Sequence, residues 1–144
     1  EKPSIGVHVR GRDFFTQGPG RGNTLTQEYY DLALDYMKNH TKNPSLYVFS
    51  DDPEWAKENV RFDEPTEYVS TDYGTNENQD LYLMSKCDHV ITANSTFSWW
   101  SAWLNENPDK KVTVPSPWKP HGYPRGIVKK WDLTPDSWKI IEWR

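Results

Sequence analysis

The most constraining feature of this sequence is the regular alternation of short β-type runs with segments of helical periodicity. Strands are predicted at residues 5–10, 45–50, 67–70, 89–93 and 111–114. Helices are predicted after Thr26, after Asp52, at residues 78–86 and at residues 96–105. This alternation is typical of consecutive βαβ units, whose strands run parallel in one sheet. The sequence therefore predicts an α/β fold with three layers, around a mostly parallel sheet of about five strands.

The helical segments carry recognisable boundaries and apolar faces. Thr26 and Asp52 are residue types that cap helices, and Pro53 suits a first helical position. The first helix places Tyr30, Ala33, Leu34 and Met37 on one face, at the spacing of a core-facing stripe. The segment 96–105 has apolar residues on too many sides for one stripe, so we expect it to be mostly buried. That expectation includes Trp99, Trp100 and Trp103.

Composition excludes several classes of protein. The chain has 144 residues, which fits one domain, and we expect residues 1–144 to form one. A net charge of −4 without a dense basic run argues against binding to nucleic acid. No apolar run is long enough to cross a bilayer, and one cysteine, Cys87, cannot form an internal disulfide. No His/Cys cluster has metal-ligand spacing. Eight Trp residues fit either a core or a carbohydrate site.

Three polar clusters follow predicted strands. They are residues 8–13 (HVRGRD), 50–52 (SDD) and 94–96 (NST). The carboxyl ends of parallel strands lie at one edge of a sheet, where ligands of open α/β folds bind. We therefore expect these clusters to converge on one site.

Each cluster also has an ordinary structural explanation. Asp52 before a proline is a helix cap, whereas a second carboxylate at Asp51 adds repulsion without helping the cap. His8 lies inside an apolar run, where a hydrogen-bonded core histidine is the commoner role. The ordinary explanation of Arg10 and Arg12 is that they are surface charges. An arginine just beyond a buried strand, however, points into the crevice or onto a helix N-terminus, where a diphosphate would be a bidentate partner. Ser95 begins a helix, and free N–H groups there both need a cap and attract anions.

These motifs together resemble the carboxyl-terminal part of glycosyltransferase family 11, the α-1,2-fucosyltransferases. Residues 8–14 (HVRGRDF) are similar to the family's H-x-R-R-x-D motif, and residues 49–55 (FSDDPEW) to its F-S-D-D-x-x-W stretch. Residues 80–89 and 93–100 (ANSTFSWW) are similar to its D-x-x-L-M-S-x-C and N-S-S-F-S-W-W signature. The resemblance spans nearly the whole chain.

The resemblance implies a Rossmann-like donor lobe of a two-lobed, GT-B-like enzyme, with an N-terminal lobe of the same chain as its partner. Related enzymes transfer L-fucose from GDP-fucose to a galactoside 2-hydroxyl of a glycan acceptor, with inversion and without a required metal or other cofactor. This segment alone is then expected to bind donor weakly and not to transfer fucose.

The resemblance also implies roles for individual residues. Arg10 would hold the β-phosphate and stabilise departing GDP, while Asp13 would organise the loop and is a candidate base. Asp51 or Asp52 would read the guanine edge, and His8 would help place the nucleotide. The donor-binding residues near the last helix start are Asn94, Ser95, Thr96 and Phe97.

One departure from the family pattern concerns Gly11. The family has adjacent arginines where this chain has Arg10 and Gly11, with Arg12 where glycine is usual. We expect a turn with positive φ at Gly11, which would turn Arg12 toward solvent. Two alternatives stay open: a nucleotide-sugar-binding domain without turnover, and a carbohydrate-binding module.

Overall fold

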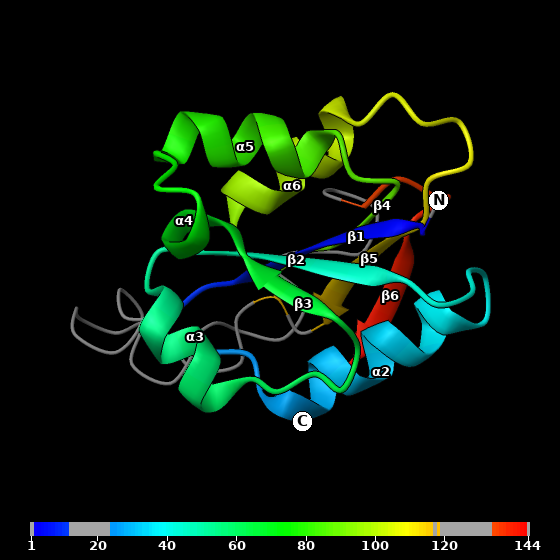
Figure 1. Ribbon diagram of the computed structural model, residues 1–144. Coiled ribbons are helices and arrows are strands. Elements are labelled where there is room, and N and C mark those ends of the chain that lie inside the picture. Colours follow the sequence, from blue (N-terminus) through cyan, green and yellow to red (C-terminus); the bar gives the residue numbers. More distant parts are fainter. Residues whose placement is uncertain (1, 12–23, 117, 119–133, 144) are drawn as a thin grey trace.

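The structure is a computed structural model that describes residues 2–11, 24–116, 118 and 134–143. The described residues form one six-stranded, entirely parallel sheet with the order β3-β2-β1-β4-β5-β6 (Figure 1). The strands are β1 (Ser4–Val9), β2 (Ser45–Ser50), β3 (Thr66–Tyr68), β4 (His89–Ile91), β5 (Val112–Ser116) and β6 (Lys139–Glu142). The predicted α/β class with a parallel sheet is confirmed.

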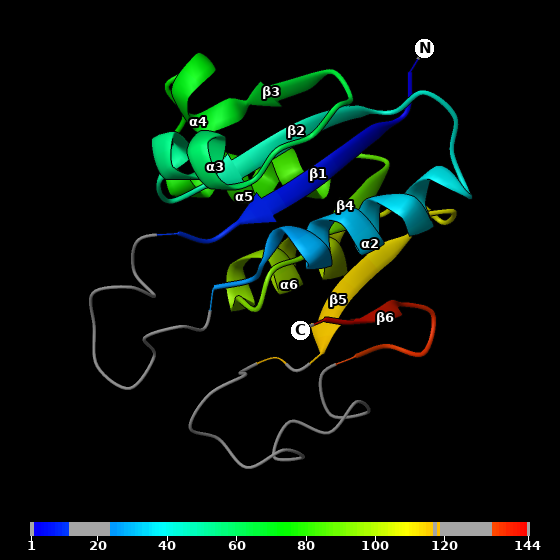
Figure 2. The same ribbon diagram turned by 90° about the horizontal axis from the view of Figure 1, so that it is seen from below.

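Helices cover both faces of the sheet and complete the three layers. They are α2 (Gln27–Lys38), α3 (Pro53–Asn59), α4 (Val69–Asp72), α5 (Glu77–Ser85) and α6 (Thr96–Leu104). In Figure 1, α2 and α3 lie below the sheet while α5 and α6 lie above it. The view from below places α2 in front of the strands and α6 behind them (Figure 2).

The alternation of side chains along β1 divides the core between the two faces. Ile5, Val7 and Val9 are buried in the cluster that includes the inner face of α2. The intervening positions face the other way, because successive side chains of a strand point to opposite faces. A Cβ atom at Gly6 would lie 2.9 Å from Met84 Cγ in α5, so this glycine permits close packing of helix on strand. The next residue on that face is His8.

Helix caps fix where several helices begin. Asp52 accepts a hydrogen bond from the Trp55 amide (3.1 Å), and Ser95 accepts one from the Phe97 amide (3.3 Å), as expected of capping residues. Thr26 occupies the N-cap position of α2, but its side chain makes no capping bond. Asn76 and Gln79 form a reciprocal capping box at the start of α5.

Two predictions of strand positions were wrong. The segment 67–70 was expected to be a strand, but β3 ends at Tyr68 and the short helix α4 follows. A sixth strand, β6, lies in the segment after residue 114, where none was expected. Its four residues pair in parallel with β5 at the edge of the sheet. The run is too short and too weakly alternating to stand out in a segment rich in Pro and Trp.

The prediction that α6 is mostly buried was also wrong. Trp100 and Trp103 are 50% and 53% exposed, and Leu104 is exposed as well. Trp99 is half-buried, with its ring stacked on Trp103 at 5.5 Å and tilted against Trp138 at 5.7 Å. Helix α6 therefore buries Ser98, Ser101 and Ala102 and leaves Trp100 and Trp103 about half exposed.

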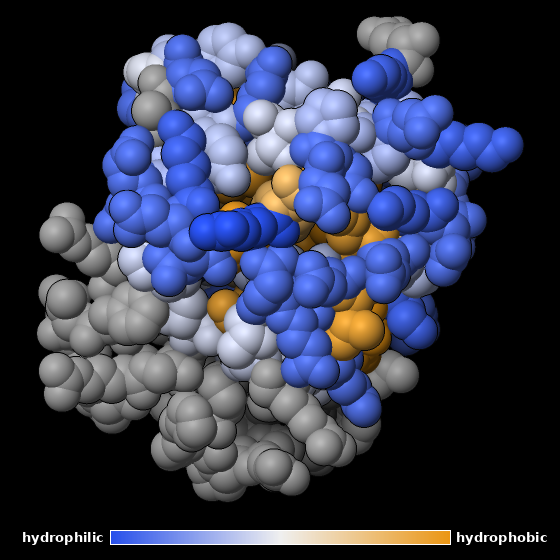
Figure 3. Space-filling view, turned by 60° about the horizontal axis from the view of Figure 1, so that its bottom comes forward, coloured by the Kyte–Doolittle hydropathy of each residue, from blue (hydrophilic) through white to orange (hydrophobic). Residues whose placement is uncertain are grey.

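The opposite face has a different surface. The view that brings the α2 side forward shows mainly charged and polar side chains around a narrow apolar strip (Figure 3). Among the described residues, no helix combines the length and apolar character that crossing a membrane requires.

Candidate functional site

The strand order places a topological switch point between the carboxyl ends of β1 and β4, the position at which open α/β sheets form a ligand-binding crevice. From β1 the chain proceeds to β2 and β3 on one side, and β4 then pairs with the other side of β1. The helix after β1 covers one face of the sheet and the helix after β4 covers the other. Ligands of open α/β sheets bind at such a switch point, outside the strand ends.

Arg10 and Ser95 meet at this switch point. Arg10 follows β1 on the same face as His8, which directs its side chain toward α6. Its Nη1 atom lies 3.4 Å from Ser95 Oγ, although the two residues are 85 positions apart. Two of the three polar clusters are therefore brought together, as predicted from the parallel sheet.

His8 is a buried, hydrogen-bonded histidine. Its Nδ1 atom is hydrogen-bonded to Ser98 Oγ (2.9 Å), and its ring lies 5.0 Å from that of Phe97. Burial and, to a smaller extent, the positive charge of Arg10 lower the pKa of His8 to about 3. The imidazole is therefore neutral at pH 7, and Arg10 supplies the positive charge beside it.

The start of α6 lies next to Arg10, and the Phe97 amide there donates a hydrogen bond to Ser95 Oγ at 3.3 Å. Ser95 and Asn94 are buried, Thr96 is exposed and Phe97 is half-buried. The side chain of Asn94 donates to the Trp118 carbonyl (3.0 Å), which joins this turn to the segment after β5. The first N–H groups of a helix attract anions through their partial positive charge.

Asp51 and Asp52 follow β2 and have different partners. Asp52 caps α3 through Trp55, as described above. The carboxylate of Asp51 is exposed, and its Oδ1 atom accepts a hydrogen bond from the Gly11 amide (2.9 Å). This bond connects the second polar cluster to the first, so all three clusters lie along one edge of the sheet.

Part of the predicted site lies outside the described residues. Asp13 and Arg12 belong to this part, so their predicted roles stay predictions. Gly11 does not have the expected positive φ, since Gly74 and Asn43 are the described residues with positive φ. The expected turn of Arg12 toward solvent lies outside the described residues. The reason for a glycine here is space: a Cβ atom would lie 2.9 Å from Trp55 Cε3.

Sequence reasoning missed two residues that support the site, Ser98 and Tyr30, and one buried carboxylate in α5, Asp80. Ser98 holds His8 and also accepts a hydrogen bond from the Ala93 amide (3.0 Å). Tyr30 donates its hydroxyl to the His8 carbonyl (2.9 Å). Asp80, a buried carboxylate in α5, accepts hydrogen bonds from Ser70 (2.5 Å) and Thr75. Ser98 and Asp80 lie in the two segments that resemble family motifs, and this was the sequence feature that could have identified them.

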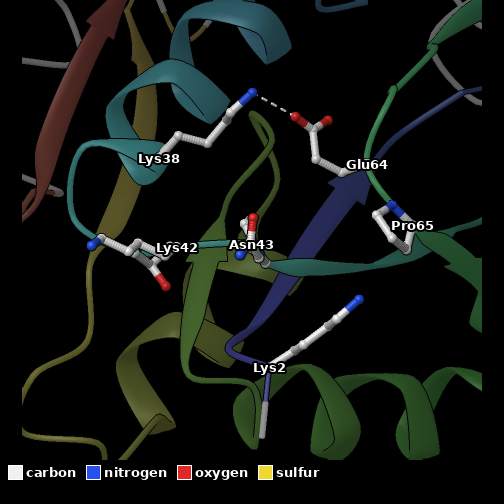
Figure 4. Close-up of a pocket in the computed structure, with 8 residues that line it drawn as sticks. Lys2, Lys38, Lys42, Asn43, Glu64 and Pro65 are labelled. Atoms are coloured by element: carbon white, nitrogen blue, oxygen red, sulfur yellow. Dashed lines mark hydrogen bonds and ion pairs between the residues drawn. The ribbon is translucent and has the colours of Figure 1, made fainter.

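A pocket at the opposite edge of the sheet is less suited to bind a diphosphate. It has a volume of about 500 Å³ and is lined by residues before β1, β2 and β3, including Lys2, Lys38 and Lys42 (Figure 4). Lys38 is paired with Glu64 at 2.7 Å, and Figure 4 shows Lys2 and Lys42 pointing in different directions. Its cations do not converge on one point, as a diphosphate would require.

The site chemistry is that of an anion-binding edge. No group of three His, Cys, Asp or Glu side chains able to hold a metal occurs in the described part of the chain. Burial raises the pKa of Cys87 to about 12, so this thiol is not an activated nucleophile. A guanidinium, a capped helix start and a neutral imidazole are together suited to bind a phosphorylated ligand.

The chain is similar to several known glycosyltransferases. The chain is 37% identical over 135 residues to "O-antigen biosynthesis glycosyltransferase WbnK" of Escherichia coli, covering 92% of this chain and 42% of that protein. It is 35% identical to "Alpha-1,2-colitosyltransferase" of Escherichia coli, over 96% of this chain and 48% of that protein. To human "Galactoside alpha-(1,2)-fucosyltransferase 1" it is 28% identical, over 69% of this chain and 28% of that protein.

The chain thus spans less than half the length of these curated relatives. The family model described as "Glycosyl transferase family 11" matches residues 1–121, which include the three polar clusters and the whole of β1 through β5. The chain belongs to glycosyltransferase family 11.

Proposed function

We propose that this chain is the donor-binding part of a fucosyltransferase that transfers L-fucose from GDP-fucose to a galactoside 2-hydroxyl. The observation that carries the proposal is the approach of Arg10 Nη1 to Ser95 Oγ at 3.4 Å. It places a guanidinium next to a helix start at the switch point of the sheet. A diphosphate in this crevice would be bound by Arg10 and by the backbone around Ser95, Thr96 and Phe97.

The same groups would stabilise the transition state. When the bond from the sugar C1 to the diphosphate breaks, negative charge increases on the leaving GDP while the acceptor oxygen bonds to C1 from the opposite side. Preorganised donors aimed at such charge each contribute about 3–4 kcal/mol. Arg10 and the α6 start would supply them without a metal ion. The acceptor proton passes to a base, for which Asp13 or a residue of a preceding lobe is the candidate.

The donor sugar has a second candidate. One relative is named a colitosyltransferase, and its alignment covers 96% of this chain. The diphosphate-binding groups do not distinguish two sugars carried on the same type of leaving group. Titration with GDP-fucose and with nucleotide-activated colitose decides between them, and tighter binding of activated colitose would overturn the fucose assignment.

A transfer assay tests the rest of the proposal. The chain is incubated with GDP-fucose and a galactoside, alone and together with the preceding lobe of a family member. We expect GDP binding but no transfer by residues 1–144 alone. Efficient transfer by this chain alone would show that a second lobe is not needed.

The exposed tryptophans favour one other function, that of a carbohydrate-binding module. Trp100 and Trp103 are about half exposed and lie on one helix, where indole rings are able to stack on sugar rings. Quenching of tryptophan fluorescence by a free galactoside, with no response to GDP, would support this second function. A response to GDP and none to the galactoside would support donor binding.

A further inference from the structure

Gly11 is held from two sides at the end of β1. Its amide donates a hydrogen bond to Asp51 Oδ1 at 2.9 Å. On another side the Trp55 ring is so close that a Cβ atom on Gly11 would lie 2.9 Å from Cε3. Both contacting residues follow β2, so the ends of two neighbouring strands are joined at this point. We call Asp51 and Trp55 the Gly11 clamp.

Arg10 directly precedes Gly11, and His8, two residues before Arg10, is also held by hydrogen bonds. His8 is bonded through its ring to Ser98 and through its carbonyl to Tyr30. The backbone on both sides of Arg10 is therefore restrained by side chains from α2, α6 and the segment after β2. An arginine side chain loses rotamer entropy when it is fixed, so the direction of its backbone decides how well it reaches a ligand.

The two acidic neighbours differ in their relation to Arg10. Asp52 caps the start of α3, where its carboxylate accepts a hydrogen bond from the Trp55 amide. Asp51 holds the residue next to Arg10. A hydrogen bond to a backbone amide needs only an acceptor oxygen, which an asparagine amide also supplies.

We infer that the Gly11 clamp positions Arg10 for the diphosphate, and that Asp51 acts through Gly11 and not by reading guanine. This inference rests on the proposed function, since it concerns the same donor crevice. Direct reading of guanine by Asp51 is the rival role. The two roles differ in one respect: a positioning residue loses its effect when Arg10 is absent, whereas a guanine contact does not.

A double-mutant cycle on GDP affinity separates these roles. Calorimetry with GDP compares the wild type with Asp51→Ala, Arg10→Ala and the double variant. We expect Asp51→Ala alone to weaken GDP binding roughly threefold to tenfold, the size of one lost hydrogen bond. In the Arg10→Ala background the same change should have almost no effect. Equal losses in both backgrounds would overturn the inference and support a guanine contact.

Two further variants control for loss of charge. Asp51→Asn keeps an acceptor for the Gly11 amide and should bind GDP nearly as the wild type does. Asp63→Ala removes an exposed carboxylate after α3 and should leave GDP affinity unchanged. An Asp51→Asn variant as weak as Asp51→Ala would show that the carboxylate charge, not the hydrogen bond, matters. That outcome also overturns the inference.

The Trp55 side of the clamp is tested by adding side-chain volume at Gly11 and removing it at Trp55. Gly11→Ala should weaken GDP binding, because its Cβ atom would overlap the indole ring. Combining it with Trp55→Phe, which removes part of that ring, should restore some of the affinity. A Gly11→Ala variant with wild-type affinity would contradict a role for Trp55.

The inference and the proposed function fail in different ways. If the folded wild-type chain does not bind GDP, the proposed function is wrong. If the wild type binds GDP and the effects of Asp51→Ala and Arg10→Ala are additive, only the clamp is wrong. Thermal unfolding of each variant shows which of them are folded, and Asp51→Asn keeps the test decisive if Asp51→Ala is not.

Discussion

His8 Nδ1 and Ser98 Oγ lie 2.9 Å apart, which joins the end of β1 to the first turns of α6. Arg10, two residues after His8, approaches Ser95 at the start of the same helix, so the end of β1 contacts α6 through two polar pairs. Ser98 Oγ also accepts a hydrogen bond from the amide of Ala93, which follows β4. The crevice is therefore built on a buried polar connection between β1, β4 and α6.

The low pKa of His8 predicts that acid weakens the fold. In the unfolded chain His8 takes up a proton below its usual pKa of 6.5, whereas the folded protein keeps it neutral down to about pH 3. The stability linked to His8 is thus present above pH 6.5 and decreases as the pH falls through this window. Between pH 7 and pH 5 we expect a loss of about 2 kcal/mol.

Urea unfolding at both pH values measures this loss. The matched variant is His8→Gln, whose pH dependence should be smaller by the same amount, whatever its stability at pH 7. An identical pH dependence for the two proteins would contradict a buried neutral His8. His89, whose pKa is also lowered by burial, is present in both proteins and cancels in the comparison.

Ser98→Ala should destabilise the protein by about 1–3 kcal/mol. The change removes the acceptor of the Ala93 amide and the partner of His8, and a buried donor without an acceptor costs this much. Thr96→Ala, two residues earlier and exposed, serves as the control and should change stability by less than about 0.5 kcal/mol. Equal unfolding midpoints for Ser98→Ala and wild type would show that this connection does not support the fold.

Arg10→Ala should reduce the free energy of GDP binding by about 1.5–3 kcal/mol, the range for a hydrogen bond to a charged partner. Arg10→Lys keeps the charge but loses the bidentate geometry, so its affinity should fall between the two. Calorimetry measures all three proteins. An Arg10→Ala variant that binds GDP as tightly as the wild type would show that Arg10 does not bind the diphosphate.

GDP binding should need no divalent ion. We base this on the acidic residues of the site, since Asp52 is engaged in capping α3 and Asp51 in binding Gly11. Titrations with EDTA and with added magnesium should give the same affinity. Affinity that disappears on chelation and returns with magnesium would mean that a metal bridges protein and diphosphate.

Much of the fold follows from local sequence, because strand and helix signals alternate clearly. The observed β2 has the predicted bounds, and the Asp52 cap with Pro53 marks the start of α3. The Arg10–Ser95 approach followed from a general property of parallel sheets and needed no detail of side-chain packing. Sequence was sufficient here because these features depend on short-range preferences and on strand direction alone.

Other features depend on long-range contacts that a single sequence does not display. Whether Trp100 is buried depends on what packs against α6, since that helix is apolar on most sides. Strand β6 is defined by pairing with β5 and not by its own four residues. The Gly11 contacts depend on where Trp55 lies after β2, which led to the wrong expectation of positive φ.

The most direct test of donor binding locates GDP on the structure. Backbone amide NMR spectra of isotope-labelled protein are recorded during titration with GDP. We predict that the amides of Arg10, Gly11, Ser95, Thr96 and Phe97 shift, while those of Lys42 and Asn43 in the opposite pocket do not. Shifts confined to that pocket or to the indoles of Trp100 and Trp103, or no shifts at all, would contradict a donor site at the carboxyl edge of β1 and β4.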